Sequence, residues 1–173
     1  MEELEITPAA INDVPSLEAL INSAYRGESS KRGWTTEADY LDGIRTDQEA
    51  LSDLIGRKDA VILKATNKNG ELMGCVFLQK KGDQLYLGML TVRPTMQDRG
   101  IGKQLLKASE DYAIANGCRS IAMTVISIRS ELIAWYERKG YKQTGQKEPF
   151  PTDPRFGKPK RRLEFIVMEK VLW

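Results

Sequence analysis

Residues 84–116 read QLYLGMLTVRPTMQDRGIGKQLLKASEDYAIAN, and this segment predicts a strand, a glycine turn and a helix in succession. Leu85 to Val92 is apolar and rich in strand-forming residues, and Pro94 ends that pattern. The apolar positions that follow lie on one helical stripe: Ile101, Leu105, Ala108, Tyr112 and Ala115. Asn116-Gly117 predicts the end of the helix, with glycine at the C′ position.

The glycine turn before the helix predicts an anion-binding site. A helix that begins on glycines offers free backbone N–H groups and the positive end of its dipole, which suit a phosphate or pyrophosphate. Arg99 and Lys103 add formal positive charge. Gly100 and Gly102 lack the third glycine of a dinucleotide fingerprint, and the turn is not a Walker A loop. Two glycines alone are typical of an ordinary turn, so the assignment depends on its context.

Two longer patterns supply that context. The first is LxVRPxxQxRGIGxxLL, with Gln97, Gly100 and Gly102 at its three defining positions. The second is AWYERKGY at residues 134–141. Together they resemble the acetyl-CoA signature and the "YEKxGF" helix end of the GNAT N-acetyltransferase superfamily. The resemblance is firm from Glu71 to Gly145, and elsewhere it extends only to the order of the elements.

The resemblance implies an α/β fold with a mixed, mostly antiparallel central sheet and helices on both faces, in a single domain over residues 1–173. In the GNAT (acyl-CoA N-acyltransferase) fold the strand before the glycine turn splays from its neighbour, and the pantetheine arm of acetyl-CoA lies in the gap. The cofactor-binding residues implied are Leu90, Thr91, Val92, Gln97, Asp98, Arg99, Gly100, Ile101, Gly102 and Lys103.

The implied activity is transfer of the acetyl group from acetyl-CoA to a primary amine of a small-molecule or amino-acid-like acceptor by direct attack. The alternatives are a non-catalytic acyl-CoA-binding module and a protein-lysine or N-terminal acetyltransferase. The reaction needs a neutral amine, donors for an oxyanion and an acid for the leaving thiolate. Tyr136 matches the family position that commonly protonates the thiolate. Its helical spacing with Leu132 and Ile133 also suits simple core packing.

The sequence departs from the family pattern in two places. Residues 87–90 read LGML, without the Glu that many relatives use as a base. The base is therefore open among Glu37, Asp39, Glu164 and solvent. Arg129 stands seven residues before the tyrosine, where many relatives have Asn, and a solvated side chain is favoured over a contact with the cofactor phosphates.

The acceptor site should come from two loops that vary in the family, around Trp34 and around Phe150. An apolar ring in a polar loop has two interpretations, which the sequence does not separate. In one interpretation the rings form a wall of the acceptor pocket. In the other they anchor their loops over the core.

Composition limits the remaining classes of function. The chain has 173 residues, a net charge of +2 and no histidine, which gives no case for nucleic acid, an anionic membrane or a metal site. No apolar run approaches a membrane span, and the N-terminus is not a signal peptide. Cys75 and Cys118 should be buried and reduced, so we expect a cytoplasmic monomer or homodimer.

Further elements follow from local patterns. Helices should begin at Asp13, at the boxes Thr36–Asp39 and Thr46–Glu49, and at Ser130. The helix from Thr36 should end near Gly43, and residues 146–162 should form a loop. The other predicted strands are Leu4–Thr7, Ala60–Thr66, Leu72–Gln79, Ser120–Ile126, Tyr141–Gly145 and Leu163–Met168.

Overall fold

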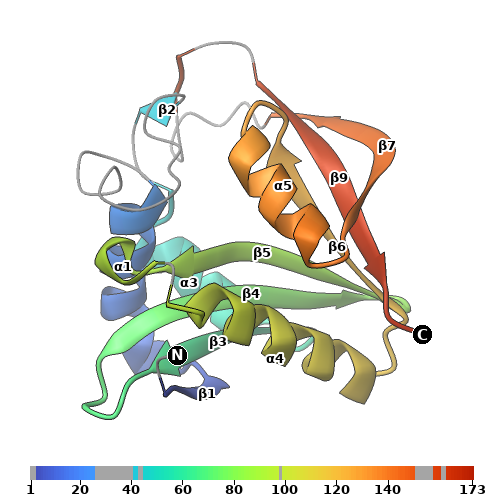
Figure 1. Ribbon diagram of the computed structural model, residues 1–173. Helices are drawn as coiled ribbons and strands as arrows, with labels where there is room; N and C mark the ends of the chain where they lie inside the picture. The colour runs from blue at the N-terminus through green and yellow to red at the C-terminus, as the bar shows by residue number, and fades with distance from the viewer. Residues whose placement is uncertain (1–2, 26–40, 43–44, 98, 151–157, 161–162) are drawn as a thin grey trace.

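A computed structural model of the chain describes residues 3–25, 41–42, 45–97, 99–150, 158–160 and 163–173. Its centre is a seven-stranded sheet with the order β1-β3-β4-β5-β6-β9-β7 (Figure 1). The strands of this sheet are β1 (Glu5–Pro8), β3 (Ala60–Thr66), β4 (Leu72–Lys81), β5 (Gln84–Val92), β6 (Ser120–Ile126), β7 (Lys142–Pro149) and β9 (Glu164–Val171). A separate pair joins β2 (Leu41–Asp42) to β8 (Lys158–Pro159).

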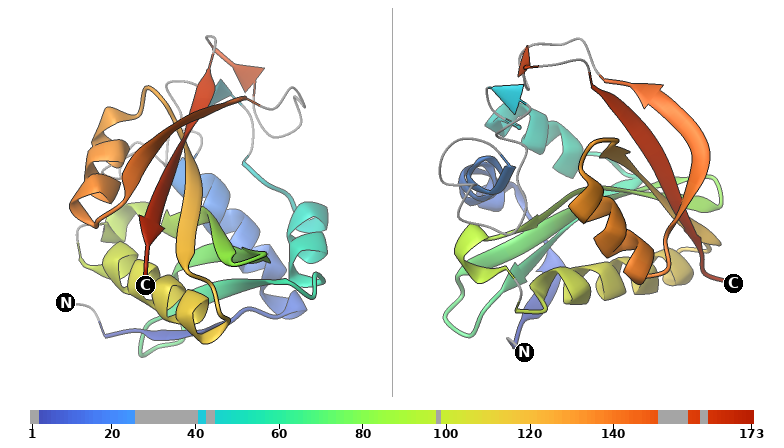
Figure 2. Two further views of the ribbon diagram at one scale, coloured as in Figure 1. Left: turned by 90° about the vertical axis from the view of Figure 1, so that its right-hand side faces the viewer. Right: turned by 45° about the horizontal axis from the view of Figure 1, so that its top comes forward.

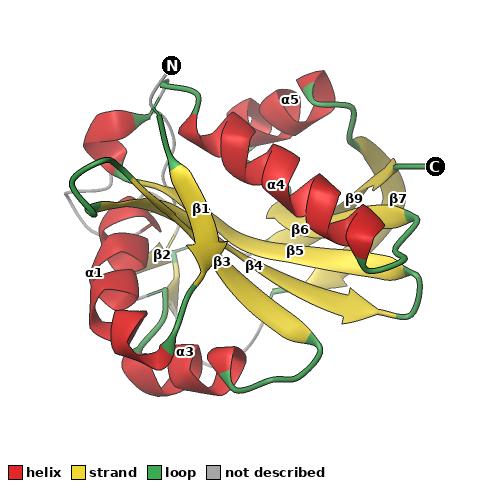
Figure 3. Ribbon diagram, turned by 90° about the horizontal axis from the view of Figure 1, so that it is seen from below, coloured by secondary structure: helices red, strands yellow, loops and turns green. Residues whose placement is uncertain are grey.

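Helices cover both faces of the sheet, as expected. One face carries α1 (Val14–Tyr25) and α3 (Gln48–Ile55), and the other carries α4 (Ile101–Ala115) and α5 (Ser130–Arg138) (Figures 2 and 3). Because side chains alternate along a strand, β3 supplies both cores. Ile62 packs in the core under α1 and α3, whereas Leu63 and Ala65 pack in the core under α4 and α5.

The parallel pair in the sheet is β5 with β6, and it is short. Register runs only from Gln84 with Ser120 to Tyr86 with Ala122. Beyond that point β6 stays paired with β9 as far as Ile126, and β5 stays paired with β4. Among the described strands, none pairs with the other edge of β5 after Tyr86. The splay implied by the family resemblance is therefore present (Figure 1).

A bulge interrupts β5 just where it has left β6. Thr91 lies opposite Cys75 and Gly88 lies opposite Phe77. Two residues of β5, Met89 and Leu90, therefore lie opposite one residue of β4, Val76. Met89, the first of these two residues, has φ 50°, a left-handed conformation that is uncommon for a side chain other than glycine. Such bulges bend a strand and redirect its backbone groups. The strand therefore bends in the part that is no longer paired with β6.

Several predicted helix starts were wrong, because neighbouring polar residues compete to cap the same helix. Asp47 rather than Thr46 is the N-cap of α3, and its carboxylate accepts a hydrogen bond from Ala50 N at 2.8 Å. Asp13 accepts from Ala10 N at 2.8 Å, so it closes the short 3₁₀ turn η1 (Ile11–Asp13) before α1. Arg129, not Ser130, is the N-cap residue of α5.

Two longer predictions also differ from the structure. The predicted loop over residues 146–162 begins as strand, because β7 continues to Pro149. Every residue of β7 is exposed, so no apolar alternation indicates it. Residues 41–42 form β2, so the helix predicted to end near Gly43 does not include them, and its other residues lie outside the described ones.

The helix after the glycine turn has the predicted bounds, and of the predicted stripe Ile101 and Leu105 are buried while Ala108 and Tyr112 pack partly buried against the core. Its buried residues include Leu106, Ser109 and Ala113, whereas Ala115 is exposed. Gly117 has φ 75°, which confirms the predicted C′ glycine. No helix in the described part of the chain is long and apolar enough to cross a membrane.

Gly74 allows α4 to pack closely on β4. A Cβ atom at this position would lie 2.6 Å from the carbonyl oxygen of Thr91 and 2.9 Å from Cδ1 of Leu105. The oxygen belongs to the backbone of the neighbouring strand, so it cannot move aside as a flexible side chain would. Glycine is therefore required here for space.

We expect Gly74→Ala to lower the free energy of unfolding by about 1–3 kcal/mol, the usual cost of overpacking a core. Urea denaturation of the purified variant measures this. Gly56→Ala is the matched control, because its Cβ would lie 3.5 Å from Ser52 O, an ordinary contact. The control should change stability by less than about 0.5 kcal/mol. Equal stability of both variants would contradict the close packing.

Candidate active site

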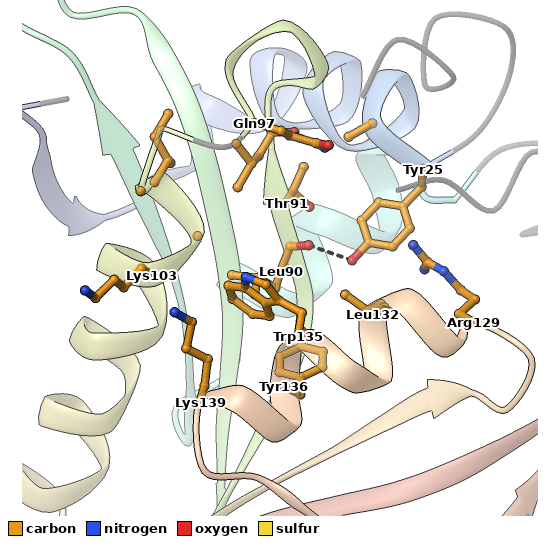
Figure 4. A pocket seen from close by; sticks show the side chains of 15 residues that line it. Tyr25, Leu90, Thr91, Gln97, Lys103, Arg129, Leu132, Trp135, Tyr136 and Lys139 are labelled. Atoms are coloured by element: carbon orange, nitrogen blue, oxygen red, sulfur yellow. Dashed lines mark hydrogen bonds between the residues drawn. The ribbon is translucent and has the colours of Figure 1, made fainter. Parts of the chain in front are cut away.

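A pocket of about 240 Å³ lies where β5, the start of α4 and α5 come together (Figure 4). It contains eight of the ten residues predicted to bind the cofactor, together with Tyr136. The lining residues are Ala24, Tyr25, Leu90, Thr91, Val92, Gln97, Gly100, Ile101, Gly102, Lys103, Arg129, Leu132, Trp135, Tyr136 and Lys139. We call this space the donor pocket.

The remaining predicted residues fall elsewhere. Arg99 is exposed and does not line the donor pocket. Asp98 and Trp34 lie outside the described residues, as do Glu37 and Asp39, the two candidate bases.

The predicted anion site has the expected backbone. Gly100 is the N-cap of α4 with φ 79° and ψ 8°, a left-handed conformation that glycine adopts without strain. The chain therefore turns directly into α4, a helix of 15 residues, and the residues at its start line one end of the donor pocket. Lys103 and Lys139 lie at this end (Figure 4), and Lys139 Nζ is 5.5 Å from the ring centre of Trp135. These groups suit a phosphate.

A second pocket, of about 300 Å³, adjoins the donor pocket. We call it the acceptor pocket. It shares Tyr25, Leu90, Arg129, Leu132 and Tyr136 with the donor pocket. Its other lining residues are Arg45, Tyr86, Leu87, Gly88, Met89, Met123, Thr124, Val125, Ile126, Phe150 and Phe165. The two spaces therefore meet where β5 bulges.

Phe150 lines the acceptor pocket and also packs within the fold. Its ring centre is 5.2 Å from that of Phe165, and it contacts the small apolar cluster of Ile126 and Leu163. The two interpretations of this ring from the sequence are therefore compatible. One face of the ring can border the pocket while the ring anchors the end of β7.

Tyr136 is both a core residue and a pocket residue. Its side chain is 5% exposed, and its ring meets those of Trp135 and Tyr141 with centres 5.1 and 5.8 Å away. Burial raises the pKa of its hydroxyl well above the ordinary value, because the phenolate would lose its hydration. Tyr25 adds to the rise and the positive charge of Arg129 opposes it. The hydroxyl therefore remains protonated and can donate a hydrogen bond into the pocket.

Tyr25 is a site residue that the sequence did not indicate. It is the last residue of α1, and its hydroxyl donates a hydrogen bond to the carbonyl oxygen of Leu90 at 2.7 Å (Figure 4). The contact joins residues 65 positions apart, so no local signal predicts it. It fixes the direction of the Leu90 carbonyl at the bulge.

Arg129 corrects a prediction, because it is neither solvated nor near the helix that forms the anion site. It is 3% exposed, and its side chain lies beside Tyr25, across the donor pocket from Lys103 and Lys139 (Figure 4). Its Nε atom is 3.9 Å from Oε1 of Glu131. The guanidinium therefore borders the junction of the two pockets.

The cysteines and the remaining candidate base lie away from this junction. Cys75 and Cys118 are buried, as predicted, and line neither pocket. Burial raises the pKa of the Cys75 thiol to about 12, so it is not a thiolate nucleophile. Glu164 is exposed and pairs with Lys147 at 3.4 Å. Among the described residues that line the two pockets, none is Asp or Glu.

Comparison with known proteins agrees with this geometry. The model of the acetyltransferase (GNAT) family matches residues 17–141. The uncharacterized protein YdhI of Bacillus subtilis (strain 168) is 28% identical over 97 residues, which are 56% of this chain and 59% of that protein. The match thus spans less than two thirds of this relative's length.

Solved structures show the same fold. The ribosomal-protein-S18-alanine N-acetyltransferase from Escherichia coli superposes with a TM-score of 0.73 and 17% identity, covering 98% of this chain and 94% of that chain. The PaiA N-acetyltransferase from Thermoplasma acidophilum, in complex with coenzyme A, has a TM-score of 0.70 and 21% identity, with 98% and 99% covered. The expected fold class is therefore confirmed.

We expect Gly102→Glu to abolish CoA binding while the protein stays folded. A Cβ at this position would point toward Trp135 and Val92 at 3.5–3.6 Å, so a longer acidic side chain would fill the donor pocket and repel phosphate. Free CoA at about 100 times its Kd should stabilise the unmodified protein by about 2.7 kcal/mol, seen as a rise in Tm. The variant should lose this rise.

Gly102→Ala is the control for folding, because its Cβ would make only ordinary contacts. It should melt close to the unmodified protein in the absence of CoA. A folded Gly102→Glu protein with unchanged CoA affinity would refute the assignment of the anion site.

Proposed function

This chain belongs to the acetyltransferase (GNAT) family, and we propose that it moves the acetyl group of acetyl-CoA to a primary amine of a small, amino-acid-like acceptor by direct attack. The observation that carries this proposal is the junction of two pockets at Leu90 and Tyr136. A donor and an acceptor held in separate pockets that meet at one point can react without a covalent enzyme intermediate.

Acetyl-CoA fits the donor pocket by its charge and its shape. Its pyrophosphate would bind the N–H groups at the start of α4, with Lys103 and Lys139 nearby. Its pantetheine arm would follow the edge of β5 from Val92 toward Leu90, which β6 leaves unpaired. The thioester would then lie at the junction of the pockets.

The chemistry needs three contributions at that junction. The neutral amine attacks the thioester carbonyl and forms a tetrahedral oxyanion. Its nitrogen then loses a proton to solvent, because no described residue lining either pocket is Asp or Glu, and the intermediate collapses and expels the CoA thiolate. We assign oxyanion stabilisation to a backbone N–H in the region from Leu90 to Val92, where the bulge redirects the strand. We assign protonation of the thiolate to Tyr136, which lines both pockets; the raised pKa of its hydroxyl keeps it protonated but also makes it a weaker acid than an exposed tyrosine.

Direct attack is favoured over an acetylated enzyme by the positions of the nucleophiles. Neither cysteine lines either pocket, and the Cys75 thiol is held in its neutral form by burial. An acyl-enzyme route through a thiolate therefore has no suitable residue among the described ones. This supports a mechanism in which both substrates are bound at the same time.

A thiol-release assay with acetyl-CoA and a panel of primary amines tests the proposal. The panel should contain amino acids, alkylamines, polyamines and lysine-containing peptides. We expect release with small amines and little with peptides. Preferred turnover of peptides would indicate a protein acetyltransferase instead. Tight acetyl-CoA binding with no release for any amine would indicate a non-catalytic acyl-CoA-binding module.

Tyr136→Phe separates the catalytic role from the packing role. It removes the donor and keeps the ring contacts with Trp135 and Tyr141. We expect kcat to fall roughly 10²-fold, the scale of a general acid, while stability changes by less than about 1.5 kcal/mol. Steady-state kinetics with the best amine, with chemistry shown to limit turnover, measures this.

The pH profile supplies a second readout for the same variant. Because the pKa of Tyr136 is raised, its hydroxyl stays protonated through the range of about pH 6 to 9. The variant should therefore lower the profile of kcat without changing its shape. An unchanged kcat would remove Tyr136 from the mechanism, and a lost inflection would mean that the hydroxyl titrates in this range.

A further inference from the structure

The charged residues in the described lining of the acceptor pocket all have the same sign. Of its described lining residues, only Arg45 and Arg129 are charged. The rest are apolar or aromatic, apart from Thr124 and the glycine of β5. A pocket that combines positive charge with apolar walls favours a ligand with one anionic group and an apolar body.

We propose that the acceptor pocket binds its substrate through a carboxylate held by Arg129 and assisted by Arg45, so that the acceptor is an α-amino acid with an apolar or aromatic side chain. This inference rests on the proposed function and specifies its substrate class. The carboxylate is the recognition group and the α-amine is the nucleophile.

Arg129 is well placed for this role because its backbone is fixed and its side chain is buried. Its N–H donates to Ile126 O at 3.0 Å, and its carbonyl accepts from Leu132 N and Ile133 N, each at 3.1 Å. These bonds tie the residue to the end of β6 and the start of α5. A guanidinium forms a planar fork that matches the two oxygens of a carboxylate. Burial strengthens such a pairing relative to one in water.

Glu131 does not remove the positive character of this position. It contacts Arg129 at 3.9 Å, which is long for an ion pair, and its side chain is 40% exposed. Glu131 lines neither pocket, whereas Arg129 lines both. Solvent screens the exposed carboxylate more than it screens the buried guanidinium.

Arg45 is the second cation of the described lining. Its backbone N–H donates to Asn22 Oδ1 at 2.7 Å, which anchors the segment to α1. Its guanidinium lies 5.4 Å from the ring centre of Tyr25. Arg45 also lines a neighbouring hollow together with Glu49 and Asp53, whose negative charges partly offset its positive charge. We therefore assign it the assisting role.

The position of Arg129 also explains why an α-amino acid fits better than a longer acceptor. In an α-amino acid the amine and the carboxylate are attached to one carbon. A carboxylate bound by Arg129 at the junction therefore brings the amine to the point where the pockets meet. The side chain would extend toward Tyr86, Phe150 and Phe165. A polyamine would instead place a second cation against two arginines.

Matched acceptors test the carboxylate directly. L-Phenylalanine, L-leucine and L-methionine should be better substrates than phenethylamine, isoamylamine and 3-(methylthio)propylamine. We expect kcat/KM to differ by about tenfold or more, the scale of one charge-assisted hydrogen bond. L-Phenylalanine amide controls for amine basicity, because its amine loses its proton at least as readily. The amide should behave like phenethylamine.

Variants locate the recognition group. Arg129→Met should lose the preference for L-phenylalanine over its amide, and Arg129→Lys should retain part of it. Because Arg129 also lines the donor pocket, the readout for both variants is the ratio of kcat/KM for L-phenylalanine to that for its amide, measured at saturating acetyl-CoA. Arg138→Met is the matched control, because Arg138 is exposed on the same helix and lines neither pocket. It should keep the full preference.

A binding experiment separates failure of this inference from failure of the proposed function. With CoA present, N-acetyl-L-phenylalanine should bind more tightly than N-acetylphenethylamine in calorimetry. If no amine releases thiol but this difference in binding is found, the carboxylate site stands and the proposed activity fails. If the amines without a carboxylate react and bind equally well, the carboxylate site is refuted while acetyl transfer stands. If Arg129→Met does not fold, the substrate pairs and Arg45→Met decide the result.

Discussion

The early end of the pairing between β5 and β6 is the constraint on which the site depends. Each strand keeps a partner on its other edge, β4 for β5 and β9 for β6, so the sheet stays intact while the two strands separate. Backbone groups that are not paired in a sheet need other partners: the Leu90 carbonyl accepts from the Tyr25 hydroxyl, and Leu90, Thr91 and Val92 line the donor pocket. The separation therefore provides both the space for a ligand and the groups to bind it (Figure 1).

Helices on both faces hold the separated strand in place. On one face, Gly74 allows α4 to lie close to β4, which brings the glycine turn beside the free edge of β5. On the other face, Tyr25 at the end of α1 bonds to the Leu90 carbonyl. The bulge at Met89 and Leu90 is thus supported from both sides, so its backbone direction does not depend on a bound ligand. Such preorganisation favours electrostatic stabilisation of a transition state.

Positively charged side chains lie at both ends of the site. Lys103 and Lys139 lie beside the helix start that suits phosphates, whereas Arg129 lies across the donor pocket from them. Tyr136 stands between these regions in a buried position. Positive charge at both ends suits two substrates that each carry an anionic group away from the reacting atoms. Under the proposed function, the protonated tyrosine would meet the atoms where charge develops during the reaction.

Local sequence was sufficient for the strand, the glycine turn and the helix from Gln84 to Asn116, because periodicity and helix-end signals depend on near neighbours. It was also sufficient for the family, through Gln97, Gly100, Gly102 and the motif around Tyr136. Local sequence predicted the first part of β7 but not its continuation to Pro149, and it did not predict the burial of Arg129. The meeting of Tyr25, Arg45 and Arg129 around Leu90 depends on tertiary structure, because α1, the segment before α3 and the start of α5 approach one another only when they pack around the divergent strands.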